Sequence, residues 1–352
     1  MLPIGDVRRI DCHLHYIPTA MPNPLRRTDE LGKLDLMRIA QDRPAYRDLR
    51  VMAQVMDQTG VDIGLIISTG TDHLRGMGPL SEVTEAYNRS LSEDLQAAEG
   101  RFLATAVVDP MGGGDELAQL KRSLKLPNIF GIGLTTGSDG VTLDDPRYLP
   151  IFELAAEYDV PVTVHPGQAW PGWVKPMRLN ETAFLLHGLG FLLADAMALF
   201  LMANAGVFER FPSVRFMFCQ LAGIAPFCCG RWDFHNKQEH LRQRLLGGET
   251  PSWASRDLRQ ILSQIWMDTH SQNRDAIRLV VDQVGEHTIV LGGDYPWTPT
   301  EFGLEYTMAE LDALQLPPGK RRKLERDNAL ALIGGPWAAG LRESVPKKTL
   351  SD

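Results

Sequence analysis

The segment RIDCHLHYIP (residues 9–18) places His13 and His15 two positions apart in an apolar run. In a β-strand, residues two apart project from the same face, so both imidazoles could bind one metal ion. Histidine is a common metal ligand, but a half-exposed strand can also carry two histidines that bind nothing. The pair alone leaves both interpretations open.

Further polar residues follow other apolar runs of the chain. They are His165, Gln220, Asp268, His270 and Asp294. Each has an ordinary structural interpretation, since His165 before Pro-Gly could simply end a strand and Asp294 could cap the next turn. Their common position after apolar runs raises the question of which elements carry them.

Eight short apolar runs rich in β-branched residues predict strands, and helical patterns separate them, for example at 46–60, 145–159 and 274–287. Buried strands that alternate with helices are typical of parallel βα units, and eight such units predict a closed (β/α)₈ TIM barrel. An open doubly wound sheet is the alternative, but no strand is followed by a GxGxxG or Walker-type loop. The predicted strands are 8–15, 61–69, 102–110, 129–137, 160–167, 214–222, 264–271 and 288–296.

The remaining segments complete the predicted organisation. Residues 19–45 and 168–182 are long loops after the first and fifth strands. The barrel domain is expected to span 1–340, with a flexible tail at 341–352. The apolar stretch 183–207 is interrupted by His187, Asp195 and Asn204, which favours a buried helix over a membrane span.

Composition narrows the class of protein. The chain has 352 residues, 44% of them hydrophobic and 23% charged, with a formal net charge of −8. An acidic chain without basic runs is not expected to bind nucleic acid. No apolar segment follows the N-terminus, and the four cysteines lack paired spacing. Both features favour a cytoplasmic protein with reduced thiols.

In a (β/α)₈ barrel the active site lies at the C-terminal ends of the strands. His13, His15, His165 and Asp294 are therefore expected to converge on one divalent metal ion. A mixture of nitrogen and oxygen ligands suits Zn²⁺, with Mn²⁺, Fe²⁺ or Co²⁺ as alternatives. Such an ion can lower the pKa of bound water to about 7 or polarise a substrate oxygen.

Several motifs resemble the amidohydrolase superfamily: HLH, VHPG, the run VFERFPSVRFMF and GGDYPW. The segments LDDPRYLPIFELAAEYDVPVTVHPG and NALALIG extend the resemblance over most of the chain. The most similar branch is that of aminocarboxymuconate-semialdehyde decarboxylase and related aromatic-acid decarboxylases. The resemblance implies a barrel enzyme with one catalytic metal, whose ligands map onto His13, His15, His165 and Asp294, and a homodimer.

One position departs from this family's pattern. The family usually carries SHxGG after the sixth strand, where the histidine is the general acid and base, whereas this chain has Gln220 there. An amide cannot exchange a proton near neutral pH, and general acid–base catalysis contributes about 10²–10⁴-fold. His270 is the nearest replacement, and Asp294 is a second. His187 and His235 are further candidates for which a structural role is favoured.

Residues around the predicted mouth could bind the substrate. Arg231 corresponds to a family arginine that binds substrate carboxylate and is lent across a dimer interface. A salt bridge with Asp233, or simple solvation at the surface, is the alternative. Trp170 and Trp297 could wall an aromatic or unsaturated acid, although tryptophan also packs cores and lids.

The expected function is that of a carboxy-lyase, a metal-dependent non-oxidative decarboxylase of an aromatic or unsaturated carboxylic acid, with a small-molecule carboxylate as substrate. The alternative is a hydrolase or hydratase of the same superfamily that uses metal-bound hydroxide. That route depends less on the missing histidine, because the metal generates the nucleophile. A non-catalytic binding protein is a third possibility, against which four intact ligands argue.

Overall fold

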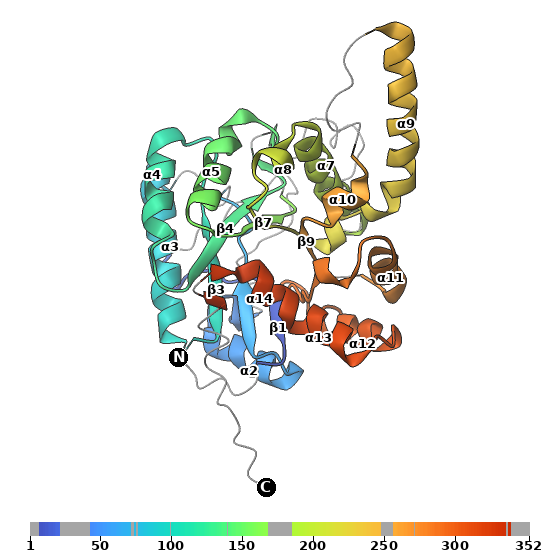
Figure 1. Cartoon of the computed structure of the whole chain (residues 1–352). Coiled ribbons are helices and arrows are strands. Elements are labelled where there is room, and N and C mark those ends of the chain that lie inside the picture. Colours follow the sequence, from blue (N-terminus) through green and yellow to red (C-terminus); the bar gives the residue numbers. More distant parts are fainter. Residues whose placement is uncertain are drawn as a thin grey trace.

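The chain forms a barrel of parallel strands surrounded by helices in the computed structural model (Figure 1). The structure describes residues 7–21, 43–71, 74, 77–98, 100–138, 140–167, 185–247, 256–270, 272–335 and 337–338. The eight strands of the main sheet are β1 (Ile10–Leu14), β2 (Ile63–Ile66), β3 (Phe102–Val107), β4 (Ile129–Thr135), β7 (Val162–His165), β8 (Phe216–Phe218), β9 (Trp266–Asp268) and β10 (Ile289–Val290).

Twelve α-helices accompany the sheet within the described part of the chain. Most follow a strand and pack on the outside of the barrel, as the βα pattern of the sequence predicts. They are α2 (Leu49–Thr59), α3 (Leu80–Ala97), α4 (Gly113–Ser123), α5 (Leu149–Glu157), α7 (Phe191–Asn204), α8 (Val207–Arg210), α9 (Cys229–Leu246), α10 (Leu258–Leu262), α11 (Arg274–Gln283), α12 (Leu304–Ala313), α13 (Pro318–Arg322) and α14 (Asn328–Ile333).

Hydrogen bonds between β1 and the segment that follows β10 close the sheet into a barrel. The neighbours run in chain order from β1 to β10, all in parallel. The Cys12 amide donates to the Leu291 carbonyl at 2.8 Å, and the Asp294 amide donates to the His13 carbonyl at 2.7 Å. The predicted (β/α)₈ barrel is therefore confirmed.

Each predicted strand run contains one observed strand, and each observed strand is shorter than its run. A small antiparallel hairpin, β5 (Gly137–Ser138) with β6 (Val141–Thr142), follows β4 and was not expected. Residues 22–42 of the first predicted long loop, all of the second (168–182) and the predicted tail 341–352 lie outside the described residues.

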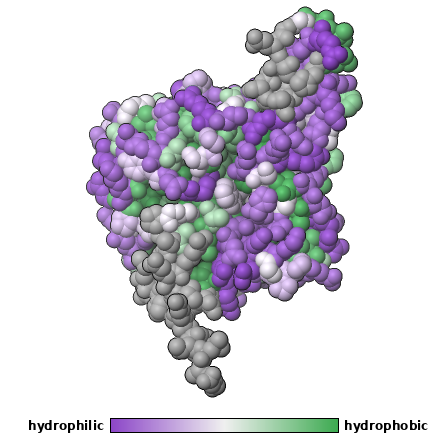
Figure 2. All heavy atoms as spheres, in the orientation of Figure 1, coloured by the Kyte–Doolittle hydropathy of each residue, from purple (hydrophilic) through white to green (hydrophobic). Residues whose placement is uncertain are grey.

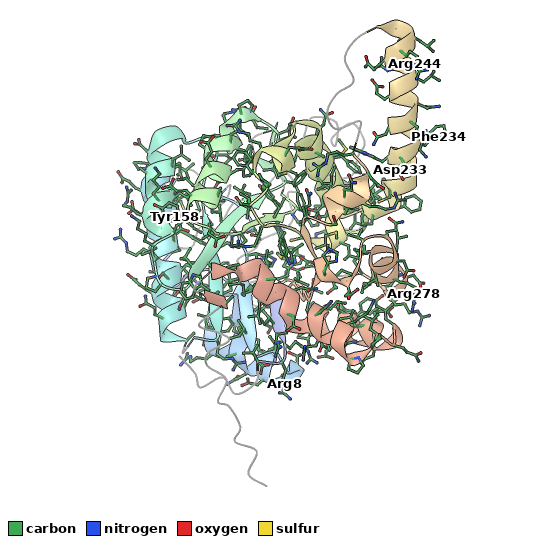
Figure 3. The ribbon with its side chains drawn as sticks, viewed as in Figure 1. Arg8, Tyr158, Asp233, Phe234, Arg244 and Arg278 are labelled. Atoms are coloured by element: carbon green, nitrogen blue, oxygen red, sulfur yellow. The ribbon has the colours of Figure 1, made fainter. Side chains whose placement is uncertain are left out.

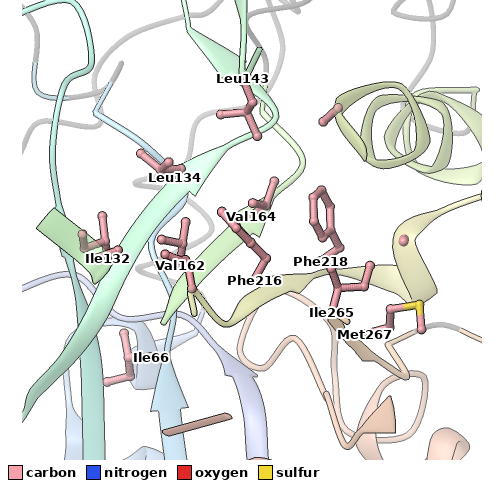
Figure 4. Close-up of a cluster of buried hydrophobic side chains, with 14 of the residues drawn as sticks. Ile66, Ile132, Leu134, Leu143, Val162, Val164, Phe216, Phe218, Ile265 and Met267 are labelled. Carbon is pink, nitrogen blue, oxygen red and sulfur yellow. The ribbon is translucent and has the colours of Figure 1, made fainter. Parts of the chain in front are cut away.

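Two apolar layers hold the barrel together. Alternate strand residues such as Ile63, Leu65 and Met217 fill its interior. The residues between them, such as Ile66 and Phe218, pack outward beneath the helices (Figure 4). This alternation is the period-two pattern of a strand with both faces covered.

A β-bulge interrupts that alternation in β1. Asp11 pairs with Gly64 but Leu14 pairs with Ile66, so β1 carries one extra residue over this interval. Ile10 and Cys12 belong to the interior layer, whereas Leu14 belongs to the outer layer. A strand of unbroken alternation would put all three on one side. The extra residue brings the odd-numbered His13 and His15 to the inner side.

The apolar stretch predicted as a buried helix forms a π-helical turn at Leu186–Gly190 followed by α7. Together they make one helix, Leu186–Asn204, that is long and apolar enough to cross a membrane, and half of its most apolar window is buried inside the protein. A Cβ on Gly223 would lie 1.8 Å from the Leu192 carbonyl oxygen, so α7 packs backbone to backbone on the turn after β8. This contact fits a core helix.

Helix α9 projects from the body of the barrel (Figure 1). Its residues Phe234 and Arg244 point away from the helix axis (Figure 3). Asp233 pairs with Arg259 of α10. Leu245 is 73% exposed and Leu246 is 72% exposed, and apolar surface is visible at the projecting end (Figure 2). Large apolar side chains this exposed are characteristic of surfaces that bind a partner.

Candidate metal centre

Four side chains from three strand ends meet at one mouth of the barrel. His13 and His15 come from the end of β1, His165 ends β7, and Asp294 follows β10. One ligand atom from each lies within 4.8 Å of the others. His15 Nε2 is 2.7 Å from Asp294 Oδ1, and His13 Nε2 is 3.2 Å from His15 Nε2. The structure thus brings together the residues that the sequence predicts as metal ligands.

Hydrogen bonds on the far side of two rings orient them. His13 Nδ1 lies 2.9 Å from Asp268 Oδ2, and His165 Nδ1 lies 2.8 Å from the Pro166 carbonyl oxygen. When Nδ1 donates these bonds, the Nε2 lone pairs face the point at which the four ligand atoms converge. This arrangement is usual for histidines that bind a metal. Burial alone would raise the pKa of Asp268, but His13 lowers it to about 2. The carboxylate therefore remains an acceptor at neutral pH.

The donor set fits a divalent cation. Asp294 Oδ1 is buried and has no hydrogen-bond partner among the described residues, although imidazole nitrogens surround it. Burial would raise the pKa of Asp294, but His270 and His13 hold it well below its usual value. Burial, with His15 and His13 nearby, lowers the pKa of His165. An ionised carboxylate and neutral imidazole are the forms that bind metals.

Two of the predicted site residues sit in left-handed backbone conformations. Asp294 has φ of 59° and Gln220 has φ of 54°, and Leu221 and Ala222 continue the same conformation. Such conformations are costly for residues other than glycine and are concentrated at functional sites. Asp294 is also held by Thr298, whose hydroxyl donates to Oδ2 at 2.8 Å.

A cavity of about 400 Å³ opens beside the four ligands. Aromatic and aliphatic side chains form much of its wall. Its described lining consists of His15, Tyr16, Ile17, Tyr46, Ile67, Thr69, Tyr87, His165, Pro166, Gly167, His187, Gly188, Phe191, Leu192, Gln220, His270, Gln272, Asp294, Trp297 and Thr298. A mostly apolar cavity with a few convergent polar groups is the usual form of a small-molecule site.

His270 and Gln220 both line this cavity. His270 Nε2 is 3.2 Å from Asp294 Oδ2, and burial lowers the pKa of His270. The Gln220 amide nitrogen of the backbone donates to Asp268 Oδ1 at 3.0 Å. The side-chain oxygen of Gln220 is buried and has no hydrogen-bond partner within the described chain. Asp268 thus links the backbone at Gln220 to the ring of His13.

Trp297 and His187 form part of the cavity wall. Their rings are stacked, with centroids 5.6 Å apart and 15° between planes. His187 lies in the π-helical turn before α7, a form often found at functional sites. The sequence favours a structural role for His187, and the structure places it at the cavity.

Other predicted residues are not at the cavity. Arg231 is exposed on α9, and no ion pair of it occurs among the described residues. Its alternative partner Asp233 is paired with Arg259, with 2.5 Å between Oδ2 and Nη1. His235 is also exposed on α9, and Trp170 lies outside the described residues.

Sequence reasoning missed several residues of the wall, which are Tyr16, Tyr46, Tyr87 and Gln272. Tyr16 and Gln272 follow predicted strands and could have been found by their proximity to His15 and His270. Tyr46 and Tyr87 start or lie within helical patterns, and nothing in their local sequence distinguishes them from core tyrosines.

The chain belongs to the amidohydrolase family, whose profile matches residues 10–335. It is 22% identical over 306 residues to a 2-amino-3-carboxymuconate-6-semialdehyde decarboxylase of Dictyostelium discoideum, with 82% of each chain covered. It is 21% identical over 306 residues to a 2-keto-4-carboxy-3-hexenedioate hydratase of a Sphingobium species, covering 81% of this chain and 82% of that one.

The fold is shared with solved structures. One is a dihydroxybenzoic acid decarboxylase from a Polaromonas species with bound manganese and the inhibitor 2-nitroresorcinol. It has a TM-score of 0.74 and 17% identity, and the match covers 92% of this chain and 96% of that chain. These likenesses agree with the family resemblance that the motifs indicate.

Proposed function

We propose that this protein is a metal-dependent, non-oxidative decarboxylase of an aromatic or unsaturated carboxylic acid. The observation that carries the proposal is the convergence of three histidines and one aspartate beside a cavity with largely apolar walls. A similar decarboxylase in Dictyostelium and one of the same fold in Polaromonas support it.

His13, His15, His165 and Asp294 would hold the metal, and Zn²⁺ is our proposal for a set of three nitrogens and one oxygen. The manganese in the Polaromonas structure keeps Mn²⁺ as the competing identity. When bound, such an ion supplies positive charge that stabilises oxygens of the substrate. Asp268 would keep the ring of His13 in the orientation needed for binding.

Decarboxylation breaks the carbon–carbon bond to the carboxylate and leaves its electron pair on a carbon that must then gain a proton. We assign the transfer of that proton, taken up from solvent or from a hydroxyl of the substrate, to His270, with Asp294 as the second candidate. His270 lines the cavity and its Nε2 lies 3.2 Å from Asp294 Oδ2. Gln220 faces the same cavity, where its amide can hydrogen-bond the substrate but cannot supply the proton.

This assignment is tested by replacing His270 with alanine and, separately, with glutamine. Loss of a general acid is expected to reduce turnover by at least about ten-fold in both variants. Gln220→His should restore part of the activity of His270→Ala, because it returns an imidazole to the cavity. Unchanged turnover in His270→Ala would remove His270 from this role.

We further propose that the enzyme is a homodimer in which Arg231 of one chain reaches the cavity of its partner and binds substrate carboxylate. Arg231 is exposed on α9, and that helix presents Phe234, Leu241, Leu245 and Leu246 to solvent. A guanidinium binds a carboxylate in a bidentate manner.

The four free thiols suit a reducing compartment, so we propose a cytoplasmic location.

The deciding experiment incubates the zinc-loaded protein with hydroxybenzoates and muconate-like acids and measures CO₂ release. Release from at least one acid, lost in Asp294→Asn, is the expected result.

The second candidate function is a hydratase, which the similarity to the Sphingobium enzyme favours. Water addition to an unsaturated acid without CO₂ release would establish it in place of decarboxylation.

A further inference from the structure

Three tyrosines line the cavity, and two of their hydroxyls are committed to protein partners. Tyr16 donates to Asp94 Oδ2 at 2.9 Å, and Tyr87 donates to the Tyr16 carbonyl oxygen at 3.3 Å. For the third, Tyr46, no hydrogen bond of the hydroxyl occurs among the described residues, and its side chain lines the cavity. Because the protein supplies no partner within the described chain, this donor is left for a molecule in the cavity.

The backbone around Tyr46 is firmly tied to both sides of the site. Its carbonyl oxygen accepts from the Ile17 amide at 2.8 Å, just beyond His15. The neighbouring Arg43 donates from Nη1 to the Pro296 carbonyl at 2.7 Å and also to the Trp297 carbonyl. Tyr46 is only 7% exposed. The position of its ring is therefore fixed by contacts with the two segments that carry His15 and Asp294.

Electrostatics keep the Tyr46 hydroxyl protonated. Burial, and then the nearby charge of Asp294, raise its pKa well above the ordinary value. A tyrosine in this state donates a hydrogen bond but does not act as a base at neutral pH.

The cavity otherwise offers an anion little from this chain. No lysine or arginine is present in its described lining, whose polar side chains are imidazoles, amides, hydroxyls, the Trp297 indole and Asp294. We propose that Tyr46 is a substrate-binding residue whose hydroxyl donates a hydrogen bond to an anionic oxygen of the substrate beside the metal ligands. This inference rests on the proposed function, since it assumes an acid or phenol as the ligand.

The test uses 2-nitroresorcinol, the inhibitor held by the Polaromonas enzyme, as a probe with the zinc-loaded protein. Calorimetry gives its Kd, and its visible absorption reports ionisation of the phenol. Tyr46→Phe is compared with Tyr87→Phe, a matched variant in the same cavity. Loss of a hydrogen bond to a charged group is expected to weaken binding by about 10–100-fold in Tyr46→Phe. Tyr87→Phe should stay within about three-fold, as expected for a neutral bond that the ligand does not use.

Both variants should keep the zinc content of the unaltered chain. Tyr46→Phe should also keep its unfolding midpoint, whereas Tyr87→Phe should lower the midpoint slightly, because it loses one hydrogen bond within the protein. Equal Kd values for Tyr46→Phe and the unaltered protein would overturn the proposal, as would equal losses in the two variants. Failure of 2-nitroresorcinol to bind the unaltered protein would overturn it too. Absence of CO₂ release with intact Tyr46-dependent binding would instead refute the decarboxylase and leave Tyr46 as a ligand-binding residue.

Discussion

At the mouth of the barrel, charged and polar side chains are withdrawn from solvent, whereas along α9 large apolar side chains face it. His13 and Asp268 are completely buried, while Leu245 and Leu246 are almost three-quarters exposed. His13 and Asp268 are paired with each other, but Asp294 Oδ1 beside them is buried without a partner among the described residues, and the exposed leucines leave apolar surface in water. The mouth has the ligand atoms for a cation, and we propose that α9 presents the surface for a second chain.

The largest effect is expected when a proposed metal ligand at the mouth of the barrel is removed. Asp294→Asn and His165→Ala are each expected to lose bound metal and to lower turnover on the order of 10³-fold, because the cation supplies several kcal/mol of charge stabilisation. Elemental analysis of protein purified without chelator, together with CO₂ release, checks this. His287→Ala changes an exposed histidine and should alter neither quantity. Full metal content in both site variants would contradict the assigned ligand set.

The next largest effect is expected from Arg231, which we propose extends from α9 of one chain to the mouth of the other. Arg231→Ala should lower kcat/KM by about 10–100-fold if its guanidinium binds the substrate carboxylate. Mixing Arg231→Ala chains with Asp294→Asn chains should then restore roughly a quarter of the activity, since half the dimers gain one intact site. Activity that stays at the level of the separate variants would show that Arg231 serves its own chain or none.

A smaller effect is expected from Asp268, which contacts the proposed ligand His13 and does not bind the metal itself. Asp268→Asn removes the charge that orients His13 and should weaken zinc binding by about 10–100-fold without abolishing it. Competition with a zinc chelator measures the affinity. Asp275→Asn, at an exposed position on α11, is the matched control. An Asp268→Asn affinity equal to that of the control would mean that the His13 ring is held by packing alone.

The smallest effect on the fold should come from α9. The double change Leu245→Glu with Leu246→Glu places charges where we propose that two chains meet. It should convert a dimer into a monomer in sedimentation and shift the free energy of unfolding by only about 0.5 kcal/mol per site, as exposed positions do. An unaltered chain that sediments as a monomer would refute the proposed role of α9.

Much of the mouth could be predicted because its chemistry is local to strand ends. His13, His165 and Asp294 each follow an apolar run, and parallel strands bring their C-terminal ends together. The eight strands were recognisable for the same reason, since buried runs between helices have few alternative structures.

The rest depends on contacts that no local pattern records. Tyr46 reaches the cavity only because Ile17 and Arg43 tie its turn to two other segments. The projection of α9 depends on where the chain leaves the barrel after β8, and its sequence is that of an ordinary charged helix without a distinct apolar face. The bulge in β1 adds no signal to the sequence at all.

That bulge makes the metal centre depend on strand register as well as on residue type. A β1 strand of the same sequence but with unbroken alternation would place Ile10, Cys12 and Leu14 on one side, and His13 and His15 would turn toward the helix layer. Each histidine would then carry a polar ring into an apolar environment. A chain could therefore preserve the whole HLH motif and have no metal site, so sequence motifs here report function only in the correct register.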